Sequence, residues 1–237
     1  MRESSYKGNE LEIFALATNW KRYVGKRTAP FIGKSVLDVG AGLGDAAVYL
    51  ATSACQSWLY LEPDSYFFDI IQAKIISGEL PAICDVLLGT TRTFQQDKLL
   101  FDTILYMDVL EHVEDDRSEL SRASNLLKDH GFLIIIVPAH PFLYSPFDKR
   151  IGHHRRYVKK HFRRICPAEF KIVRLDYLDS VGIVASLANR LFLRNTMPTR
   201  KQIDFWDKIM VPISRIIDPL LFNRIGKSLL AVFEKNP

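Results

Sequence analysis

The amino-acid sequence predicts an α/β fold: a doubly wound, Rossmann-like sheet with helices on both faces. Apolar segments that resemble strands alternate with segments of helical periodicity over the first two thirds of the chain, and such alternation implies mostly parallel strands joined by helices. The segment 132–137 is almost continuously apolar, which is typical of a parallel strand covered on both faces. A glycine-spaced turn follows the first predicted strand. These observations predict a ligand site at the carboxyl ends of the strands.

Composition places the chain among globular proteins. Its 237 residues are 48% hydrophobic and 25% charged, which suits one sizeable domain, so we treat 1–237 as a single domain. The net charge of +5 indicates either an anionic partner or a solvated basic face. Three widely spaced cysteines argue against a disulfide framework or a zinc site. We expect a cytoplasmic protein without a signal peptide or membrane span, with peripheral contact to the inner face of a membrane left open.

The segment 36–45, VLDVGAGLGD, organises the rest of the chain. It reads as a strand, a G-x-G-x-G turn and the start of a helix near Gly44. Glycines at Gly40 and Gly42 leave space for a nucleotide-like ligand, and the helix points unpaired N–H groups toward the same space. The turn could also be purely structural. Asp38, two residues before the first glycine, is badly placed for a pyrophosphate but well placed for a cation.

The other elements are predicted in order along the chain. Residues 9–29 form an amphipathic helical cap, and a strand at 57–62 leads to Asp64, which caps a helix that runs to about Gly78. Asp116 to Glu119 reads as a capping box that opens a helix ending near Gly131. The remaining predicted strands are 83–88, 101–107, 132–137, 170–175 and 228–233, with a substrate loop at about 138–165 and a helical insertion at about 176–226.

These motifs resemble those of class I S-adenosylmethionine-dependent methyltransferases. The glycine turn resembles their first motif, and 101–113 with 131–138 resembles their fourth and fifth. The resemblance implies a seven-stranded sheet with an antiparallel last strand, S-adenosylmethionine as cofactor and S-adenosylhomocysteine as product. Glu62 would bind the ribose diol, and Thr90 stands where many relatives place an acid for the adenine amine. The implied cofactor-binding residues are Asp38, Gly40, Ala41, Gly42, Gly44, Glu62, Pro63, Gly89, Thr90, Met107 and Asp108.

A second resemblance covers the segment after the fifth predicted strand. Residues 138–157 are similar to the P-x-x-x-L-[aromatic]-S…D…G-H-x-R-R-Y segment of bacterial type 11/12 methyltransferases associated with surface-glycan or glycosyltransfer pathways. This implies a small or lipid-linked, sugar-containing acceptor, with O- or N-methylation left open. Arginine forks suit an acceptor phosphate, although the basic run 149–164 could equally be a solvated face. The expected substrate-binding residues are Tyr144, Asp148, His154, Arg155, Arg156 and Tyr157.

Histidines are the candidate bases, because an imidazole has a suitable pKa for removing a hydroxyl proton. We expect His140 or His153 first and His112 next, although each could instead bond a loop carbonyl. Asp108 and Glu111-His112 also resemble the E-x-x-E-H element of metal-assisted methyltransferases in ubiquinone biosynthesis and small-RNA methylation. The same string occurs in metal-free relatives, so we expect no metal.

Three alternatives stay open. The apolar residues of the insertion could pack in the core, form a homodimer interface or rest on a membrane. An RNA-directed methyltransferase could use the basic run, but Asp108 does not introduce the Asn-Pro-Pro-Tyr string of many nucleic-acid base methyltransferases, so we do not expect nucleic acid as the acceptor. A non-catalytic, cofactor-binding partner protein is the remaining alternative.

Overall fold

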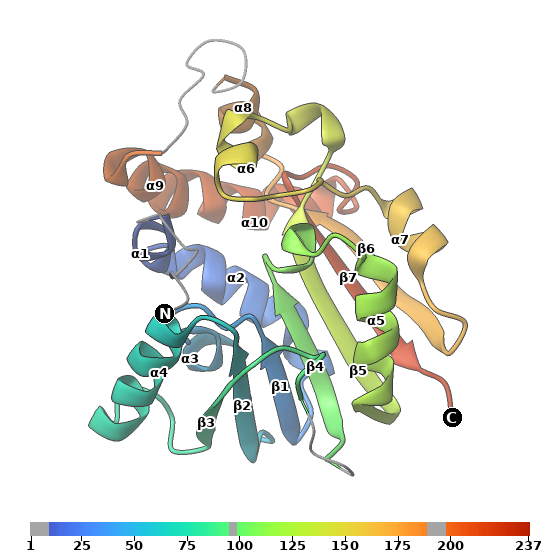
Figure 1. Ribbon diagram of the computed structural model, residues 1–237. Helices are drawn as coiled ribbons and strands as arrows, with labels where there is room; N and C mark the ends of the chain where they lie inside the picture. Colours follow the sequence, from blue (N-terminus) through green and yellow to red (C-terminus); the bar gives the residue numbers. More distant parts are fainter. Residues whose placement is uncertain (1–9, 95–98, 189–197) are drawn as a thin grey trace.

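A computed structural model describes residues 10–94, 99–188 and 198–237, so residue 9 of the predicted cap and 189–197 of the predicted insertion lie outside the described residues. Seven strands form one sheet in the order β3-β2-β1-β4-β5-β7-β6 (Figure 1). β7 runs antiparallel to β5 and β6, and the other pairs are parallel. The predicted fold class is confirmed. The strands are β1 (Ser35–Val39), β2 (Ser57–Glu62), β3 (Cys84–Leu88), β4 (Phe101–Met107), β5 (Leu127–Pro138), β6 (Phe170–Leu178) and β7 (Ser228–Lys235).

Helices cover both faces of the sheet and enclose two apolar layers. One layer contains Trp58 and Ile71 and is covered by α2 (Thr18–Thr28), α3 (Ala46–Leu50), α4 (Ser65–Ser77) and α10 (Val211–Leu220). The other contains Leu120 and Phe162 and is covered by α5 (Asp116–Asn125) and α7 (Lys159–Ile165), which lie together on the near face in Figure 1. Strand order reverses between β1 and β4, so a crevice opens at their carboxyl ends.

The amino-terminal cap consists of two helices, where the sequence predicts one. α1 (Glu10–Ala15) ends before Ala17, and α2 begins at Thr18. Asp207, which is buried, accepts hydrogen bonds from the N–H groups of Asn19 and Trp20 through its two carboxylate oxygens (3.1 and 2.8 Å). Asp207 thereby caps α2 from the far end of the chain, and a local helical pattern cannot reveal such a cap.

The boundary between α5 and β5 also differs from the prediction. The capping residue is Asp115, whose side chain accepts from the Ser118 N–H, and the helix ends at Asn125. β5 begins at Leu127, ahead of the predicted start at 132, because Leu127 pairs with Phe101 before an irregularity in the register. Asp116, the predicted cap, is buried and accepts from Tyr157 instead.

The insertion folds back onto the first layer through buried aspartates. It contains α8 (Gly182–Ala188), α9 (Arg200–Phe205), the π-helical turn η5 (Trp206–Met210) and α10. Asp179 accepts hydrogen bonds from the Trp206 indole and the Ser214 hydroxyl, both at 2.6 Å. Asp218 accepts from the Tyr23 hydroxyl of α2 (2.8 Å). These bonds tie the insertion to the amino-terminal helices. In the part of the chain that the structure describes, every helix is too short or too polar to cross a bilayer.

Candidate functional site

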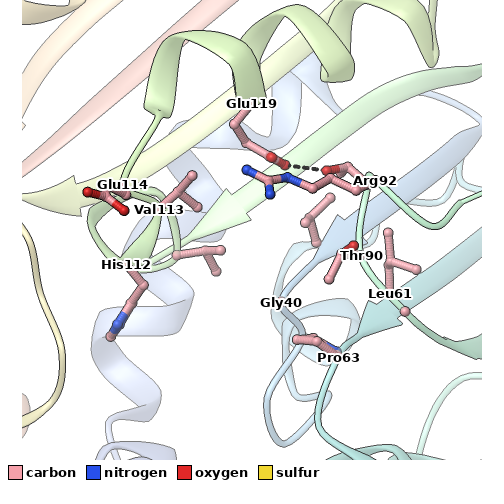
Figure 2. Close-up of a pocket in the computed structure, with 13 residues that line it drawn as sticks. Gly40, Leu61, Pro63, Thr90, Arg92, His112, Val113, Glu114 and Glu119 are labelled. Carbon is pink, nitrogen blue, oxygen red and sulfur yellow. Dashed lines mark hydrogen bonds between the residues drawn. The ribbon is translucent and has the colours of Figure 1, made fainter.

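A cavity of about 400 Å³ lies at the carboxyl ends of the first four strands (Figure 2). Figure 2 shows His112, Val113 and Glu114 on one wall, facing Gly40 and Thr90 on the other. Four predicted cofactor-binding residues line the cavity: Gly40, Pro63, Gly89 and Thr90. The sequence analysis missed three charged lining residues, Arg92, Glu114 and Glu119. The strand-end rule would have found Arg92, because it follows β3 by four residues.

The glycine turn forms the floor of this cavity. Gly40 has a φ of +69°, and a Cβ there would lie 2.8 Å from Cγ2 of Val109, a cavity-lining residue. Gly42 has a φ of +57°, and its Cβ would lie 3.4 Å from a methyl of Leu11 in α1. Protein side chains therefore approach the turn closely at both glycines, and the space for a ligand beside them stays a prediction. Gly44 and Ala41 complete the turn, and the Gly44 N–H donates to the Ala41 carbonyl (2.9 Å).

Two buried carboxylates support the turn from below. Glu62 accepts hydrogen bonds from the N–H groups of Gly42 (2.7 Å) and Asp64 (2.9 Å), one on each oxygen. Asp38 is 2% exposed and accepts from the Trp58 indole (3.3 Å). Burial raises the pKa of Asp38 to about 7, against the effect of that hydrogen bond. No cation among the described residues forms an ion pair with Asp38. Its binding to a cofactor amine stays a prediction.

The wall after β4 is polar and charged. Met107 ends β4, and Asp108 follows with a φ of +55° and a side chain open to solvent. Desolvation by the surrounding protein raises the pKa of Asp108, although its interactions with His153, Lys227 and Arg156 oppose that rise. The Lys227 ammonium lies 3.6 Å from the centre of the Trp206 ring and 3.5 Å from Asp179. The sequence analysis did not select Lys227, because nothing local distinguishes a lysine that precedes the last strand.

The structure brings two of the three candidate histidines together. His112 belongs to the short helix η2 (Leu110–His112), and its ring centre lies 4.7 Å from that of His153. Desolvation and the neighbouring His153 lower the pKa of His112 to about 4, so its ring is neutral at pH 7. His140 lies apart from this pair, stacked on Tyr177 at 4.6 Å with its Nε2 buried. The expected roles of His140 and His153 as first candidates for the base stay predictions.

The predicted substrate loop is held together by Asp148. This residue, at 0% exposure, lies in α6 (Pro146–Arg150) and forms a two-point ion pair with Arg156 at 2.8 and 2.9 Å. His153 Nδ1 lies 2.9 Å from the same carboxylate, and the Tyr144 hydroxyl donates to the His153 carbonyl (2.7 Å). Hydrogen bonds from His153 and Arg156 lower the pKa of Asp148 despite its burial. Ion pairs and hydrogen bonds between residues of the loop itself therefore stabilise its conformation.

These contacts correct the expected roles of the arginines and of Tyr157. Arg155 pairs with Asp116 (2.8 Å) and donates to the Glu114 carbonyl (2.6 Å). Arg156 is engaged by Asp148, so neither guanidinium presents a free fork to a phosphate. Tyr157 is fully buried and stabilises the loop from inside. His154 is exposed, and its backbone N–H donates to the Glu111 carbonyl (2.8 Å).

Replacing Arg156 with alanine is expected to lower the free energy of unfolding by about 3 kcal/mol, because it leaves the buried Asp148 carboxylate without its cation. Urea denaturation followed by circular dichroism measures this change. Arg163→Ala is the matched control, since Arg163 is exposed on α7, and its effect should stay within about 0.5 kcal/mol. Equal effects of the two substitutions would contradict the structural role of the Asp148 pair.

Comparison with known proteins supplies the family. Residues 15–180 match the family model described as a methyltransferase domain. A tRNA U34 carboxymethyltransferase from Ruthia magnifica subsp. Calyptogena magnifica is 32% identical over 117 residues, which cover 49% of this chain and 36% of that protein. The (S)-coclaurine N-methyltransferase of Papaver somniferum is 31% identical over 121 residues, 49% of this chain and 34% of that protein. The aligned region thus spans about a third of the length of these two relatives.

A solved structure shows the same fold at low identity. The [4+2]-cyclase SpnF aligns with a TM-score of 0.63 at 14% identity, covering 92% of this chain and 80% of that one. Its name states a different reaction from that of the sequence relatives, which illustrates that fold alone does not fix chemistry. The family match extends over most of the chain, from α1 to the end of β6, and includes the glycine turn and the cavity. This chain therefore belongs to the methyltransferase-domain family, whose cofactor is S-adenosylmethionine.

Proposed function

We propose that the protein transfers the methyl group of S-adenosylmethionine to a hydroxyl or amine of a small or lipid-linked, sugar-containing acceptor. The observation that carries the proposal is the cavity at the ends of β1 to β4, with the glycine turn on one side and a polar wall on the other. The two sequence relatives are named for different acceptors, a tRNA and an alkaloid. The acceptor is therefore inferred from the residues of this chain.

The residues on the turn side fit the cofactor. Pro63 and Thr90 border the cavity where an adenine would lie, and Glu62 retains lone pairs for a ribose hydroxyl beyond the two N–H groups it binds. Asp38 is a buried carboxylate without a described counter-ion, which suits the cationic amino group of the cofactor. When bound, the cofactor supplies an electrophilic methyl group. These residues would hold it in place, and alignment with the acceptor provides much of the rate.

The residues on the other wall favour a polar acceptor. His112 and Glu114 place hydrogen-bonding and charged groups on this wall, and Asp108 precedes the lining residue Val109. The side chains of His112 and Glu114 offer hydrogen-bond partners to the hydroxyls of a sugar. A hydroxyl must lose its proton during transfer, and the neutral ring of His112 could accept it.

The lipid-linked form of the acceptor is supported by an exposed apolar face. This face comprises Phe205, Ile209, Ile213, Ile216 and Leu220, which recur at spacings of three and four residues along α9, η5 and α10. Such a stripe can rest on a bilayer surface or pair with a second copy of the chain. Flotation with anionic liposomes tests the membrane contact. Recovery of the protein only in the lipid-free fraction, together with a dimer in sedimentation, would favour the homodimer.

The proposed function is tested by labelling. The purified protein is incubated with methyl-labelled S-adenosylmethionine and a bacterial extract, which is then separated into lipid, RNA and small-molecule fractions. Label in the lipid fraction, or in sugars of the small-molecule fraction, is the expected result. Label in RNA would replace the acceptor with a nucleic acid. Absence of label from all three fractions, with cofactor binding shown separately, would favour the non-catalytic partner protein.

A further inference from the structure

One carboxylate and two imidazoles meet around His112, one of the residues that line the cavity. Glu111 and His112 are neighbours in η2, and His153 reaches them from the loop that follows α6. One ligating atom from each residue lies within 4.8 Å of the other two. Bonds to a first-row divalent ion are about 2.1 Å long, so ligand atoms on one ion lie about 3 Å apart. Inward movement of each side chain by about 1 Å would bring the three atoms to that spacing.

Glu111 is the residue that points to a cation. Its side chain is 0% exposed, and neither carboxylate oxygen accepts a hydrogen bond from another residue in the described parts of the chain. The nearest imidazole nitrogen, His153 Nε2, is 3.7 Å from Oε1, which is too long for a hydrogen bond. Burial of an ionised carboxylate in this state is strongly unfavourable, so the group must either take up a proton or be compensated by a positive charge.

The neighbours of the two histidines orient them for ligation. Asp148 lies 2.9 Å from His153 Nδ1, which leaves Nε2 directed at Glu111. A carboxylate on the remote nitrogen is the usual partner of a metal-binding imidazole. His112 forms a hydrogen bond with the backbone of Gly152 through its ring, which leaves its other nitrogen for a ligand. Each ring is therefore held on one side and available on the other.

We propose that Glu111, His112 and His153 bind one divalent first-row transition-metal ion. Two nitrogens and one carboxylate suit Mn²⁺, Fe²⁺, Co²⁺ or Zn²⁺ better than Mg²⁺ or Ca²⁺, which prefer oxygen ligands. The proposal departs from the metal-free site expected from the sequence. That expectation rested on the string from Asp108 to His112, and the sequence alone could not place His153 beside it.

The role of the ion rests on the proposed function. Three protein ligands leave coordination positions open, and an oxygen of the acceptor could occupy one of them next to Asp108. With the ion bound, His112 and His153 would be ligands, so His112 would not have the role of base that it has in the proposal without a metal. Metal binding itself is independent of this role, because it requires neither cofactor nor acceptor.

Cobalt titration of the purified full chain tests the proposal. After chelator treatment and dialysis, Co²⁺ is added without cofactor, and visible absorption reports nitrogen ligation. The expected result is one ion per chain, displaced by Zn²⁺. Glu111→Gln and His153→Ala should each weaken binding by at least 100-fold. His112→Ala should do the same, and because this side chain is exposed the variant should keep the fold.

His130→Ala is the matched control, since His130 is an exposed histidine near the opposite end of β5. Its cobalt affinity should equal that of the unmodified protein within about twofold. The proposal is overturned if saturable one-to-one binding is absent below about 100 µM Co²⁺, or if the Glu111 and His112 variants bind as tightly as the control. The second outcome would show that these side chains do not bind the ion. If the unmodified protein binds cobalt but transfers no methyl group to any acceptor, only the proposed function is refuted.

Discussion

Gly40→Val is expected to weaken S-adenosylmethionine binding by at least 100-fold. A Cβ at this position would lie 2.8 and 3.0 Å from the two methyl groups of Val109, so Val109 would have to move. It would move into the cavity that it lines and occupy space needed by the cofactor. A β-branched residue at a φ of +69° also strains the turn that supports the cofactor. Both effects act on the same wall of the cavity.

Gly78→Val separates these two effects. Gly78 has a φ of +76°, and a Cβ there meets nothing within 4 Å, so this variant carries the backbone strain without a steric contact. Both variants should lose about 1–3 kcal/mol of stability from strain, but only the Gly40 variant should lose cofactor affinity. Isothermal titration with S-adenosylhomocysteine measures the affinity of each. Binding by the Gly40 variant within about fivefold of the unmodified protein would show that the cofactor lies elsewhere.

The elements that local sequence could predict are those whose signals are local. Apolar runs predict β2 and β4 at the positions where the structure has them. The caps Asp64 and Gly78 likewise predict both ends of α4. Each of these signals acts within a few residues of the element it predicts. The break between α1 and α2 depends on Asp207, 188 residues from Asn19. The early start of β5 depends on the partner Phe101. Such long-range contacts leave no trace in the periodicity of the segment itself.

The residues of the candidate site also fall into those that sequence patterns can predict and those that depend on long-range contacts. The resemblance to known motifs selected Gly40, Pro63 and Thr90, and all three line one cavity. Sequence patterns work here because these residues follow the ends of neighbouring strands. These patterns could not tell which charges are used inside the protein, and so Arg155 and Arg156 were expected to face a ligand although they pair with Asp116 and Asp148. Charge pairing across a loop is decided by tertiary packing, which the spacing of basic residues does not encode.

Asp38→Asn is expected to stabilise the protein at pH 8 and weaken cofactor binding at the same time. Burial raises the pKa of Asp38 to about 7, so the folded state binds this proton more tightly than the unfolded state. The resulting stabilisation is complete below about pH 4 and is lost as the pH rises to about 7, with a total of up to roughly 4 kcal/mol. The asparagine variant lacks this loss. Urea denaturation between pH 4 and 8 should therefore show that its free energy of unfolding changes less with pH than that of the unmodified protein.

Cofactor binding should respond to pH in the opposite direction. A cationic amino group favours ionised Asp38, so affinity for S-adenosylhomocysteine should rise about fivefold between pH 6 and pH 7 and level off about twofold higher above the pKa of Asp38. The Asp38→Asn variant should bind weakly at every pH. 5′-Methylthioadenosine is the control ligand, because it lacks the amino-acid group and its affinity should not change with pH. An equal pH dependence for both ligands would contradict pairing of Asp38 with the amine. The carboxylate would then destabilise the fold at neutral pH without serving the cofactor.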